Sequence, residues 1–252
     1  MNWGFDGRAE GHSRKNRDLH RGHREHRARR EEKEATWIMI GEKKQKGAAG
    51  YVLAGGGSRR FGRDKALAEL GGQPMIARMM ALVRGVTAET RLVATRGKYV
   101  ASEAEFLVDR WPGQGPLGGI ITALENTAKN SADISCEWNL ILSCDMPFLT
   151  PDWLAYLIER AIASEAEIVV PHSAHGPEPL CACWKSSAVE ILRPAFEHGV
   201  RRVNEGISLL RAEVLDERDW KRFDSAGRLF WNMNTPADYE EARRILEAAE
   251  KQ

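Results

Sequence analysis

Features of membrane and secreted proteins are scarce in this sequence of 252 residues. No apolar run approaches the roughly 18 residues that a membrane-spanning helix needs, and the first residues lack the apolar core of a secretory signal. Cysteine is limited to four residues, which lie in apparent core segments: Cys136, Cys144, Cys181 and Cys183. We therefore expect a reducing, cytoplasmic setting and no association with a membrane.

A strong net charge is also absent, because 37 Lys and Arg residues are balanced by 36 Asp and Glu residues. The balance gives no overall attraction to nucleic acid or to a membrane surface. Residues 1–46, however, are crowded with Arg, Lys, Glu and His and contain few apolar residues. We expect this segment to be a disordered tail; an alternative is that the true start is Met39. Its interspersed Glu residues argue against a nucleic-acid-binding arm.

From Gly47 onward, short apolar segments alternate with amphipathic segments of about a dozen residues. This alternation predicts an α/β fold of three layers, α/β/α, with a mostly parallel sheet in a single domain at 47–252. The first expected strand lies within 47–57 and runs into a glycine loop, and another lies within 138–149 and ends sharply at Asp145. The other expected strands lie at 91–95, 105–109, 167–171, 179–184 and 228–236. The expected helices lie at 74–86, 115–128, 151–163, 186–199, 203–213 and 236–251, and Pro194 is expected to kink or break the fourth.

A glycine-rich stretch, LAGGGSRRFGRDKA at residues 53–66, follows the first expected strand. Gly55, Gly56 and Gly57 let the backbone approach a ligand closely, and successive N–H groups in such a turn can bind an anion. Cations follow at Arg59, Arg60, Arg63 and Lys65. The stretch is neither G-x-G-x-x-G nor a Walker A sequence. With these cations so close, a phosphate site is favoured over an ordinary glycine turn.

Asp145 stands where the buried strand LILSC should end. A desolvated carboxylate needs a partner, and Mg²⁺ is held in many proteins by one or two carboxylates together with phosphate oxygens. Ligands in parallel α/β folds bind beyond the carboxyl ends of the strands, which would place Asp145 beside the glycine loop. A magnesium site is favoured over a turn cap or a pair with an Arg. Cys144 is interpreted as a core residue.

The other polar candidates leave alternatives open. Asp109 could bind ribose, base or metal, or cap a turn. Asn232 and Asn234 alternate with Met233 and are expected on one side of a strand, where they could bind a cation or phosphate; Asn234 or Thr235 could equally cap the following helix. Four further residues resemble a zinc set but lack its usual spacing, and we reject that interpretation: His172, His175, Cys181 and Cys183.

Taken together, these motifs resemble the molybdenum cofactor guanylyltransferase (MobA-type) family over about 200 residues, from Gly50 nearly to the C-terminus. LAGGGSRRFGRDKA is similar to the opening motif of the family, GPLGGI to its middle motif, CDMPFL to its metal-binding motif and NMNTPADY to its late motif. The first and third also occur in relatives that transfer CMP or sugar-linked nucleotides. GPLGGI together with NMNTP favours the guanylyl branch.

The resemblance implies a Rossmann-like nucleotide-binding sheet, like that of nucleotide-diphospho-sugar transferases, with Mg²⁺ as cofactor. GTP and molybdopterin or the molybdenum cofactor would be the substrates, and proteins that insert the cofactor into enzymes would be further partners. Asp145 would hold Mg²⁺, Lys65 would meet the phosphates together with Arg60, and Asn232 and Asn234 would contact the acceptor. The remaining residues would bind the nucleotide: Leu53, Ala54, Gly55, Gly56, Thr95 and Asp109. Thr95 stands where relatives often have an Asn that helps to bind guanine.

The expected activity is transfer of GMP from GTP to the phosphate of molybdopterin, with release of pyrophosphate. Positioning and charge neutralisation would carry the catalysis, and no dedicated general base is expected. A cytidylyltransferase on the same fold is the nearest alternative. A GTP-binding module without catalysis is the alternative from another class, and the presence of both Lys65 and Asp145 argues against it.

Overall fold

The computed structural model describes residues 45–55, 61–62, 64–99, 105–130, 136–224 and 226–249. These residues belong to one compact unit, Lys43–Gln252. The first strand begins at Gln45, two residues inside the segment assigned above to a tail, and residues 1–44 lie outside the described residues. The structure thus describes the segments that carry the sequence motifs, apart from 56–60 and Arg63 in the glycine stretch.

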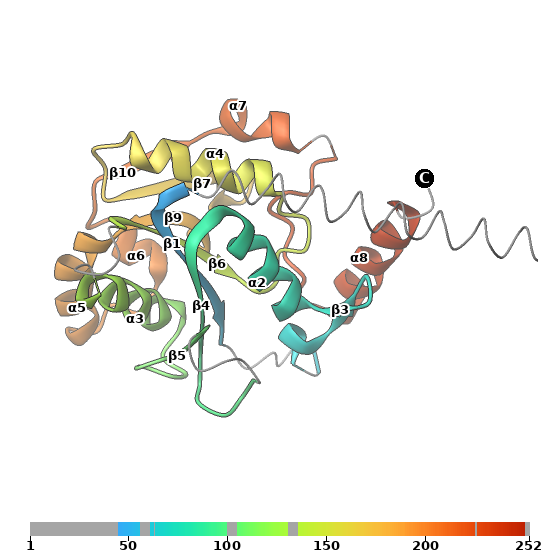
Figure 1. Cartoon of the computed structure of the whole chain (residues 1–252), viewed down its shortest axis with the longest axis horizontal. Coiled ribbons are helices and arrows are strands. Elements are labelled where there is room, and N and C mark those ends of the chain that lie inside the picture. The colour runs from blue at the N-terminus through green and yellow to red at the C-terminus, as the bar shows by residue number, and fades with distance from the viewer. Residues whose placement is uncertain are drawn as a thin grey trace, which may run out of the picture. The chain divides into compact units, whose positions relative to one another are not determined.

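An eight-stranded sheet lies at the centre of the described residues (Figure 1). Its order is β10-β7-β9-β6-β1-β4-β5, and β8 pairs with β7. All neighbours on this path are parallel except β9, which is antiparallel to both β6 and β7. The strands are β1 Gln45–Ala54, β4 Thr87–Ala94, β5 Phe106–Val108, β6 Trp138–Ser143, β7 Ile168–Ser173, β8 Gly176–Pro177, β9 Cys181–Lys185 and β10 Ala212–Leu215, and a separate hairpin joins β2 Glu69–Leu70 to β3 Gln73–Pro74.

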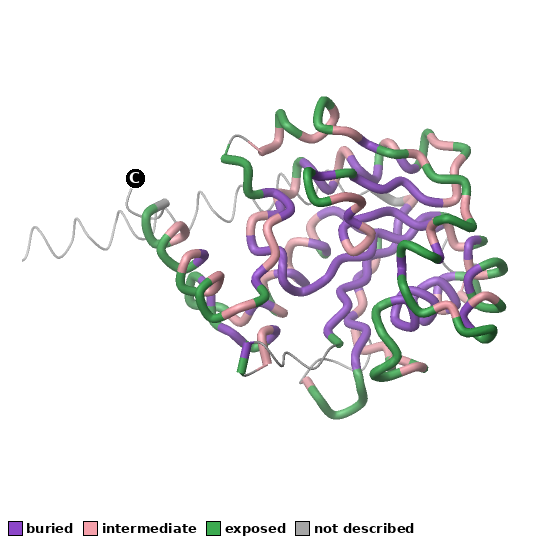
Figure 2. The backbone as a smooth tube through the Cα atoms, turned by 180° about the vertical axis from the view of Figure 1, so that it is seen from behind, coloured by how far each residue is buried: buried purple, intermediate pink, exposed green. Residues whose placement is uncertain are grey.

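Helices cover both faces of the sheet, which confirms the expected three-layer, mostly parallel α/β fold. They are α2 Met75–Val86, α3 Pro116–Lys129, α4 Pro151–Ile162, α5 Val189–Glu197, α6 Val203–Ile207, α7 Glu217–Trp220 and α8 Pro236–Ala249. The alternation of side chains along β1 divides the core: Val52 joins the cluster under α2 and α4, whereas Tyr51 and Leu53 join the cluster under α3, α5 and α6. Buried residues concentrate in the central strands and the inner helix faces (Figure 2).

Close packing between β1 and α2 depends on the absence of a side chain at Gly50. A Cβ atom at Gly50 would lie 2.2 Å from Val83 Cγ1 and 2.6 Å from Thr87 Oγ1. Neither neighbour can retreat easily, because both are buried. Helix α2, which follows the glycine-rich stretch and the β2–β3 hairpin, is therefore held directly against β1.

Local signals explain where α4 and α5 begin and end. The Thr150 side chain accepts a hydrogen bond from the Trp153 backbone N–H, and Pro151 occupies the first helical position, as the sequence predicts. Pro194 lies inside α5, and the helix continues through it, so the expected break there is wrong. The helix spans nine residues, and Pro194 lies in its second turn, where its missing N–H removes one hydrogen bond without ending the helix.

Two expected elements are corrected by the structure. Residues 203–213 were expected to form one helix, but α6 ends at Ile207, and Ala212 and Glu213 belong to the edge strand β10. Residues 228–236 were expected to form a strand, but the described segment is irregular up to the start of α8. Its backbone groups bond to other parts of the chain, so tertiary contacts override the apolar pattern of Leu229–Met233.

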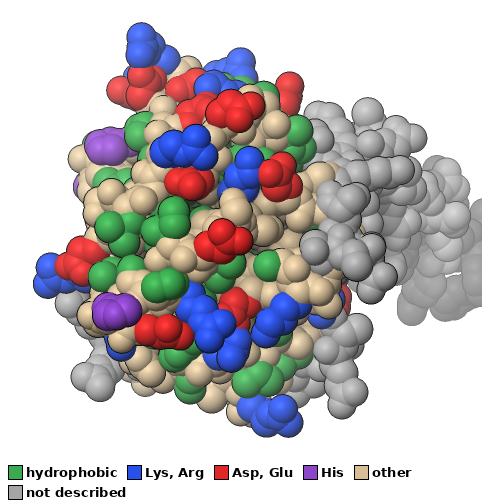
Figure 3. Space-filling view, turned by 90° about the vertical axis from the view of Figure 1, so that its left-hand side faces the viewer, with side chains coloured by type: hydrophobic (Ala, Val, Ile, Leu, Met, Phe, Trp, Pro, Cys, Tyr) green, Lys and Arg blue, Asp and Glu red, His purple; other side chains and the backbone are tan. Residues whose placement is uncertain are grey.

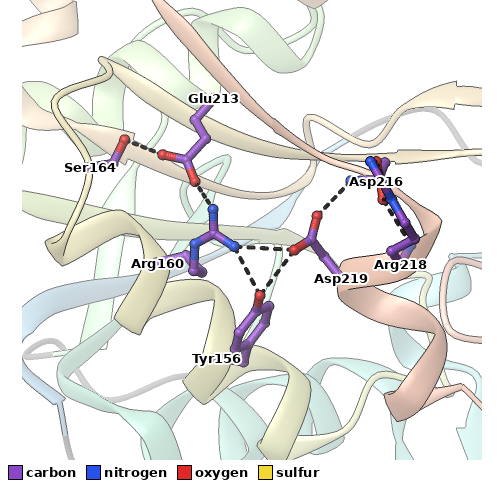
Figure 4. A network of polar contacts seen from close by, with 7 residues as sticks. All are labelled: Tyr156, Arg160, Ser164, Glu213, Asp216, Arg218 and Asp219. Carbon is purple, nitrogen blue, oxygen red and sulfur yellow. Dashed lines mark hydrogen bonds and ion pairs between the residues drawn. The ribbon is translucent and has the colours of Figure 1, made fainter.

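An Arg-centred network ties β10 and α7 to α4 (Figure 4). Arg160 on α4 pairs with Glu213 on β10 at 2.5 Å and with Asp219 on α7 at 3.1 Å. Tyr156 also donates to Asp219 at 3.1 Å, and Ser164 donates to Glu213 at 2.6 Å. The network fixes the far edge of the sheet.

Among the described residues, no helix combines the length and the apolar character needed to span a bilayer.

Candidate nucleotide-binding site

A cavity of about 520 Å³ lies at the carboxyl ends of β1, β4 and β6 and beside the N-terminus of α3. This is the edge of the sheet where ligands of parallel α/β folds bind. Its lining combines small residues with a few polar groups: Leu53, Gly55, Lys65, Val93, Asp109, Gly113, Gly115, Pro116, Gly119, Ser143, Cys144, Asp145 and Leu180. The structure therefore brings the glycine stretch, the loop after β5 and the end of β6 to one cavity, as expected.

Lys65 and Asp145 form an ion pair in this cavity, between Lys65 Nζ and Asp145 Oδ2. Asp145 is buried, with 8% of its surface exposed, and its Oδ1 accepts a hydrogen bond from the Ser143 hydroxyl. Each carboxylate oxygen thus has one partner and keeps a second lone pair. Lys65 Nζ also donates to Asn234 Oδ1 at 3.3 Å. A cation, an acidic side chain and an amide oxygen therefore meet at one point.

The irregular segment before α8 is fixed to the loop that carries Asp145. The Met233 N–H donates to the Asp145 carbonyl oxygen at 2.8 Å, and Met233 is fully buried. Asn234 is exposed at this point, beside Lys65. Asn232 instead donates its side-chain amide to the Phe230 carbonyl oxygen at 3.1 Å. The expectation that both Asn residues share one side of a strand is therefore wrong, and Asn234 is the one that reaches Lys65.

Thr235 resolves the helix-cap alternative that the sequence left open. Its hydroxyl accepts from the Asp238 N–H at 3.2 Å, and the Asp238 carboxylate accepts in return from the Thr235 N–H at 2.7 Å. Asp238 also accepts from the Asn234 N–H at 2.8 Å. Despite the opposing effect of burial, these hydrogen bonds lower the pKa of Asp238 below its ordinary value. Because Thr235 supplies the cap, the side chain of Asn234 is left to accept from Lys65, which lines the cavity.

The N-terminus of α3 opens onto the same cavity. Gly115 precedes the helix with φ of 93°, a conformation that favours glycine, and Pro116 begins it. No side chain caps this end, so backbone N–H groups and the positive end of the helix dipole are available to an anion. Gly118 lets the preceding loop approach, because a Cβ there would lie 2.9 Å from Trp111 Cβ. The glycines of GPLGGI thus shape an uncapped helix N-terminus at the wall of the cavity.

Asp109 lines the cavity and also holds the loop after β5. Its N–H donates to the Ala94 carbonyl oxygen, and its side chain accepts from the Trp111 N–H at 2.9 Å and from the Thr122 hydroxyl at 3.4 Å. Both of these side-chain contacts use Oδ1. The second oxygen, Oδ2, remains for a ligand in the cavity.

The other expected site residues have different positions. Leu53 and Gly55 line the cavity, whereas Ala54 is fully buried in β1 and Thr95 is exposed just after β4, outside the lining. Gly56 and Arg60 lie outside the described residues.

Sequence reasoning overlooked Asp64, which caps the turn that begins at Lys65. Asp64 precedes the 3₁₀ turn Lys65–Leu67 and accepts from the Ala66 N–H at 3.1 Å. It also accepts from the Tyr99 hydroxyl at 2.8 Å and pairs with Lys98 at 3.1 Å. Although burial opposes it, these hydrogen bonds lower the pKa of Asp64, and burial together with Asp64 raises the pKa of Tyr99. The adjacent acidic and basic residues in R-D-K were the available signal.

Ser143 and Leu180 were also overlooked. Ser143 lies two residues before Asp145, so a hydroxyl at the end of the strand was visible in S-C-D. Leu180 had no such signal, because it reaches the cavity only through the reversed direction of β9, where its carbonyl oxygen accepts from the Ser143 N–H at 2.9 Å. Burial raises the pKa of Cys144, which lies between Ser143 and Asp145, to about 12, in keeping with a core residue.

Among the described residues, no cluster of three or more His, Cys, Asp and Glu side chains is arranged to bind a metal. A divalent cation at Asp145 would therefore take one protein carboxylate and fill its other positions with substrate oxygens and water, a pattern usual for Mg²⁺. Asp145 fits this role, because its carboxylate is buried at the cavity wall and already oriented by Ser143.

A mostly parallel sheet with a cavity at its carboxyl edge, lined by a Lys and an Asp, has the architecture of a nucleotide-binding α/β protein. Residues 50–212 match the MobA-like NTP transferase domain, and the chain belongs to this family. A probable molybdenum cofactor guanylyltransferase from Pelotomaculum thermopropionicum is 30% identical over 203 residues, which cover 79% of this chain and 94% of that protein. The molybdenum cofactor guanylyltransferase of Desulfosudis oleivorans is 31% identical over 201 residues, which cover 79% of this chain and 96% of that protein.

Solved structures agree with the fold. The molybdopterin-guanine dinucleotide biosynthesis protein A of Archaeoglobus fulgidus superposes with a TM-score of 0.67 at 27% identity, over 79% of this chain and 99% of that one. The 2-C-methyl-D-erythritol 4-phosphate cytidylyltransferase of Thermus thermophilus superposes with a TM-score of 0.57 at 14% identity, over 79% of this chain and 98% of that one, a likeness of fold alone.

Proposed function

We propose that this protein transfers GMP from GTP to the phosphate of molybdopterin or of the molybdenum cofactor, and so forms a guanine dinucleotide cofactor. The relatives that share about 30% of its sequence carry the name of this activity. The observation that carries the proposal is the pairing of Lys65 with Asp145 at the cavity between β1, β6 and α3. This pairing supplies a cation for phosphates and a carboxylate for a divalent metal at one point.

The nucleotide would occupy the part of the cavity over β1 and β4. The backbone at Gly55, the N-terminus of α3 and Lys65 offer positive groups to a triphosphate that carries about four negative charges at neutral pH. Asp109 would accept from ribose or base through Oδ2, and Leu53 would contact the nucleotide from the strand end. The roles of Ala54, Gly56, Thr95 and Arg60 are carried over from the family motif: the first three would contact the nucleotide and Arg60 its phosphates.

In the reaction, an oxygen of the acceptor phosphate would form a bond to the α-phosphorus of GTP, and the bond from that phosphorus to the bridging oxygen would break. Pyrophosphate would leave with the bond electrons. Lys65 would neutralise the phosphates and hold them in line, and Asp145 would hold Mg²⁺. Bound Mg²⁺ would stabilise the charge of the pentavalent transition state. The acceptor phosphate is ionised near neutral pH, so the chain needs no general base.

The acceptor would lie on the other side of Asp145, beside the segment before α8. In-line displacement requires the entering phosphate and the leaving pyrophosphate on opposite sides of the α-phosphorus. Asn234 is the better placed of the two Asn residues, because it is exposed and already bonds to Lys65. Asn232 would then contribute by its hydrogen bond to the Phe230 carbonyl oxygen, which helps to fix the conformation of the segment. Proteins that insert the finished cofactor into enzymes would receive the product.

The decisive experiment incubates the protein with Mg²⁺, molybdopterin and each of the four nucleoside triphosphates in turn, and measures pyrophosphate and the dinucleotide product. The proposal expects product with GTP and at least about a tenfold lower kcat/KM with CTP, a discrimination of about 1.4 kcal/mol. Equal or faster reaction with CTP would identify a cytidylyltransferase. GTP binding without any turnover would identify a module without catalysis.

A further inference from the structure

A buried carboxylate lies at the carboxyl edge of the sheet and has no part in the reaction described above. Glu178 precedes β9 and has 9% of its surface exposed. Its backbone is fixed at both sides, since its N–H donates to the Pro171 carbonyl oxygen and its own carbonyl oxygen accepts from the Cys181 N–H. Its side chain accepts one hydrogen bond, from the Ser173 hydroxyl at 2.6 Å. In the described part of the chain, no Lys or Arg is paired with it by an ion pair.

Such a residue is costly to the fold. A buried carboxylate is stabilised best by a cation or by several donors, and a single hydroxyl satisfies only part of its capacity. Burial raises the pKa of Glu178, and the nearby charge of Asp145 adds to this effect, while Ser173, His175 and His172 oppose it. Leu180, two residues after Glu178, lines the same cavity as Asp145. A glutamate kept there without a strong internal partner is suited to an external one.

The topology places Glu178 on the acceptor side of Asp145. Along the carboxyl edge, the strand order places β6 between β1 and β9, so the segment that enters β9 reaches the cavity at its Asp145 end, where Leu180 lines it. Leu180 in that segment bonds to Ser143 at the end of β6. The proposed function places the acceptor on this side, opposite the leaving pyrophosphate. Glu178 therefore lies where the acceptor rather than the nucleotide is expected.

We infer that Glu178 is an acceptor-binding residue that accepts hydrogen bonds from the pterin ring of the acceptor. A pterin carries a ring N–H and an exocyclic amino group side by side, and a carboxylate offers two oxygens to two adjacent donors. The same matching lets Glu and Asp read amino groups on nucleic acid bases. This inference rests on the proposed function, and it adds selectivity for a heterocycle with adjacent donors to a site otherwise built for phosphates.

The test measures steady-state transfer from GTP to molybdopterin for the wild type and three variants. Glu178→Gln replaces one acceptor oxygen with a donor, and we expect the KM for molybdopterin to rise roughly tenfold to a hundredfold, with the KM for GTP changed less than about twofold. Ser173→Ala keeps the carboxylate and should change the KM for molybdopterin less than about threefold. Glu137→Gln is the matched control, because Glu137 is exposed just before β6, at the other end of that strand from Asp145. This variant should leave both KM values unchanged.

The outcomes separate the alternatives. A purely structural role for Glu178 predicts that Ser173→Ala and Glu178→Gln cause equal losses, and that result would overturn the inference. A KM for molybdopterin within about twofold of the wild type in Glu178→Gln would overturn it as well. If the wild type itself forms no dinucleotide, that result contradicts the proposed function, and it also overturns the inference that rests on it.

Discussion

The backbone N–H of Met233 donates a hydrogen bond to the carbonyl oxygen of Asp145 across 88 residues of sequence, from 145 to 233, at 2.8 Å. The family match ends at residue 212, so this bond ties a segment beyond the matched region to the loop at the centre of the site. The segment also brings Asn234 to Lys65. The last described part of the chain therefore belongs to the functional unit.

Replacement of Asp145 by Asn should separate catalysis from folding. Asp145→Asn keeps the shape of the side chain but removes the charge that pairs with Lys65 and would hold the metal. We expect Mg²⁺-dependent pyrophosphate release to fall roughly a hundredfold or more, whereas Ser143→Ala, which only removes the orienting hydroxyl, should cost about tenfold. Initial rates across a Mg²⁺ titration would measure both. Near-normal rates in Asp145→Asn would contradict the metal assignment.

Replacement of Gly50 by Ala should destabilise the protein without touching the cavity. The new methyl group would meet Val83 and Thr87 at distances that no relaxed packing allows. We expect a loss of about 1–3 kcal/mol in the free energy of unfolding, measured by urea denaturation. Gly55→Ala is the control, because a Cβ there meets nothing within 4 Å. Its stability should stay near that of the wild type, while its affinity for GTP falls.

The stability contributed by Asp64 should depend on pH. Its folded-state pKa is lowered below the ordinary value of 3.8, so its contribution is fully present above that value and is lost as pH falls through the lower folded pKa. The difference in unfolding free energy between the wild type and Asp64→Asn should therefore be constant at neutral pH and shrink below about pH 4. Denaturation at several pH values would show this. A difference that grows on acidification would contradict the assignment.

Arg160 should stabilise the edge of the sheet. Arg160→Leu breaks its pairs with Glu213 and Asp219 and leaves both carboxylates without this cation. Because 37% of the Arg160 side chain is exposed, solvent screening limits the expected loss to about 1–2 kcal/mol. Arg244→Leu, on the exposed side of α8, should change stability by less than about 0.5 kcal/mol. Chemical denaturation of both variants tests the difference, and equal values would rule out a special role for the network.

A further face of the protein carries mixed charges. Over α3, α5 and α6, Lys and Arg side chains lie among Asp and Glu side chains (Figure 3). Arg110 and Arg193 both pair with Glu125, which is buried under them. Interspersed charges of both signs give this face little of the uniform positive potential by which proteins bind the phosphates of nucleic acid.

The sequence was sufficient for the order of the main strands and helices because their apolar periods are strong. It was also sufficient to bring Lys65 and Asp145 together, since parallel strands end at one edge and both residues follow strands. The segment Leu229–Met233 misled because its alternation reflects burial against the core rather than pairing in a sheet. The single backbone bond from Met233 to Asp145 could only be seen in three dimensions.

Asp64 and Glu178 were harder to predict than Lys65 and Asp145. Asp64 is held by Tyr99 and Lys98, which are more than 30 residues away in sequence and belong to the loop after β4. Glu178 looks like an ordinary loop glutamate in G-P-E-P-L, and only its burial distinguishes it. Spacing in sequence contains information about strand ends, but not about which loops meet above them.

The reversed direction of β9 has a consequence for the size of the site. Because β9 lies between β6 and β7, the two strands that end at the carboxyl edge on either side of it are two strand spacings apart, about 9.5 Å. A continuous parallel sheet would have had a strand end, and the loop that follows it, in that interval. Here the interval is spanned by the short segment that enters β9, so Leu180 of that segment, rather than a loop that follows a parallel strand, forms this part of the cavity wall.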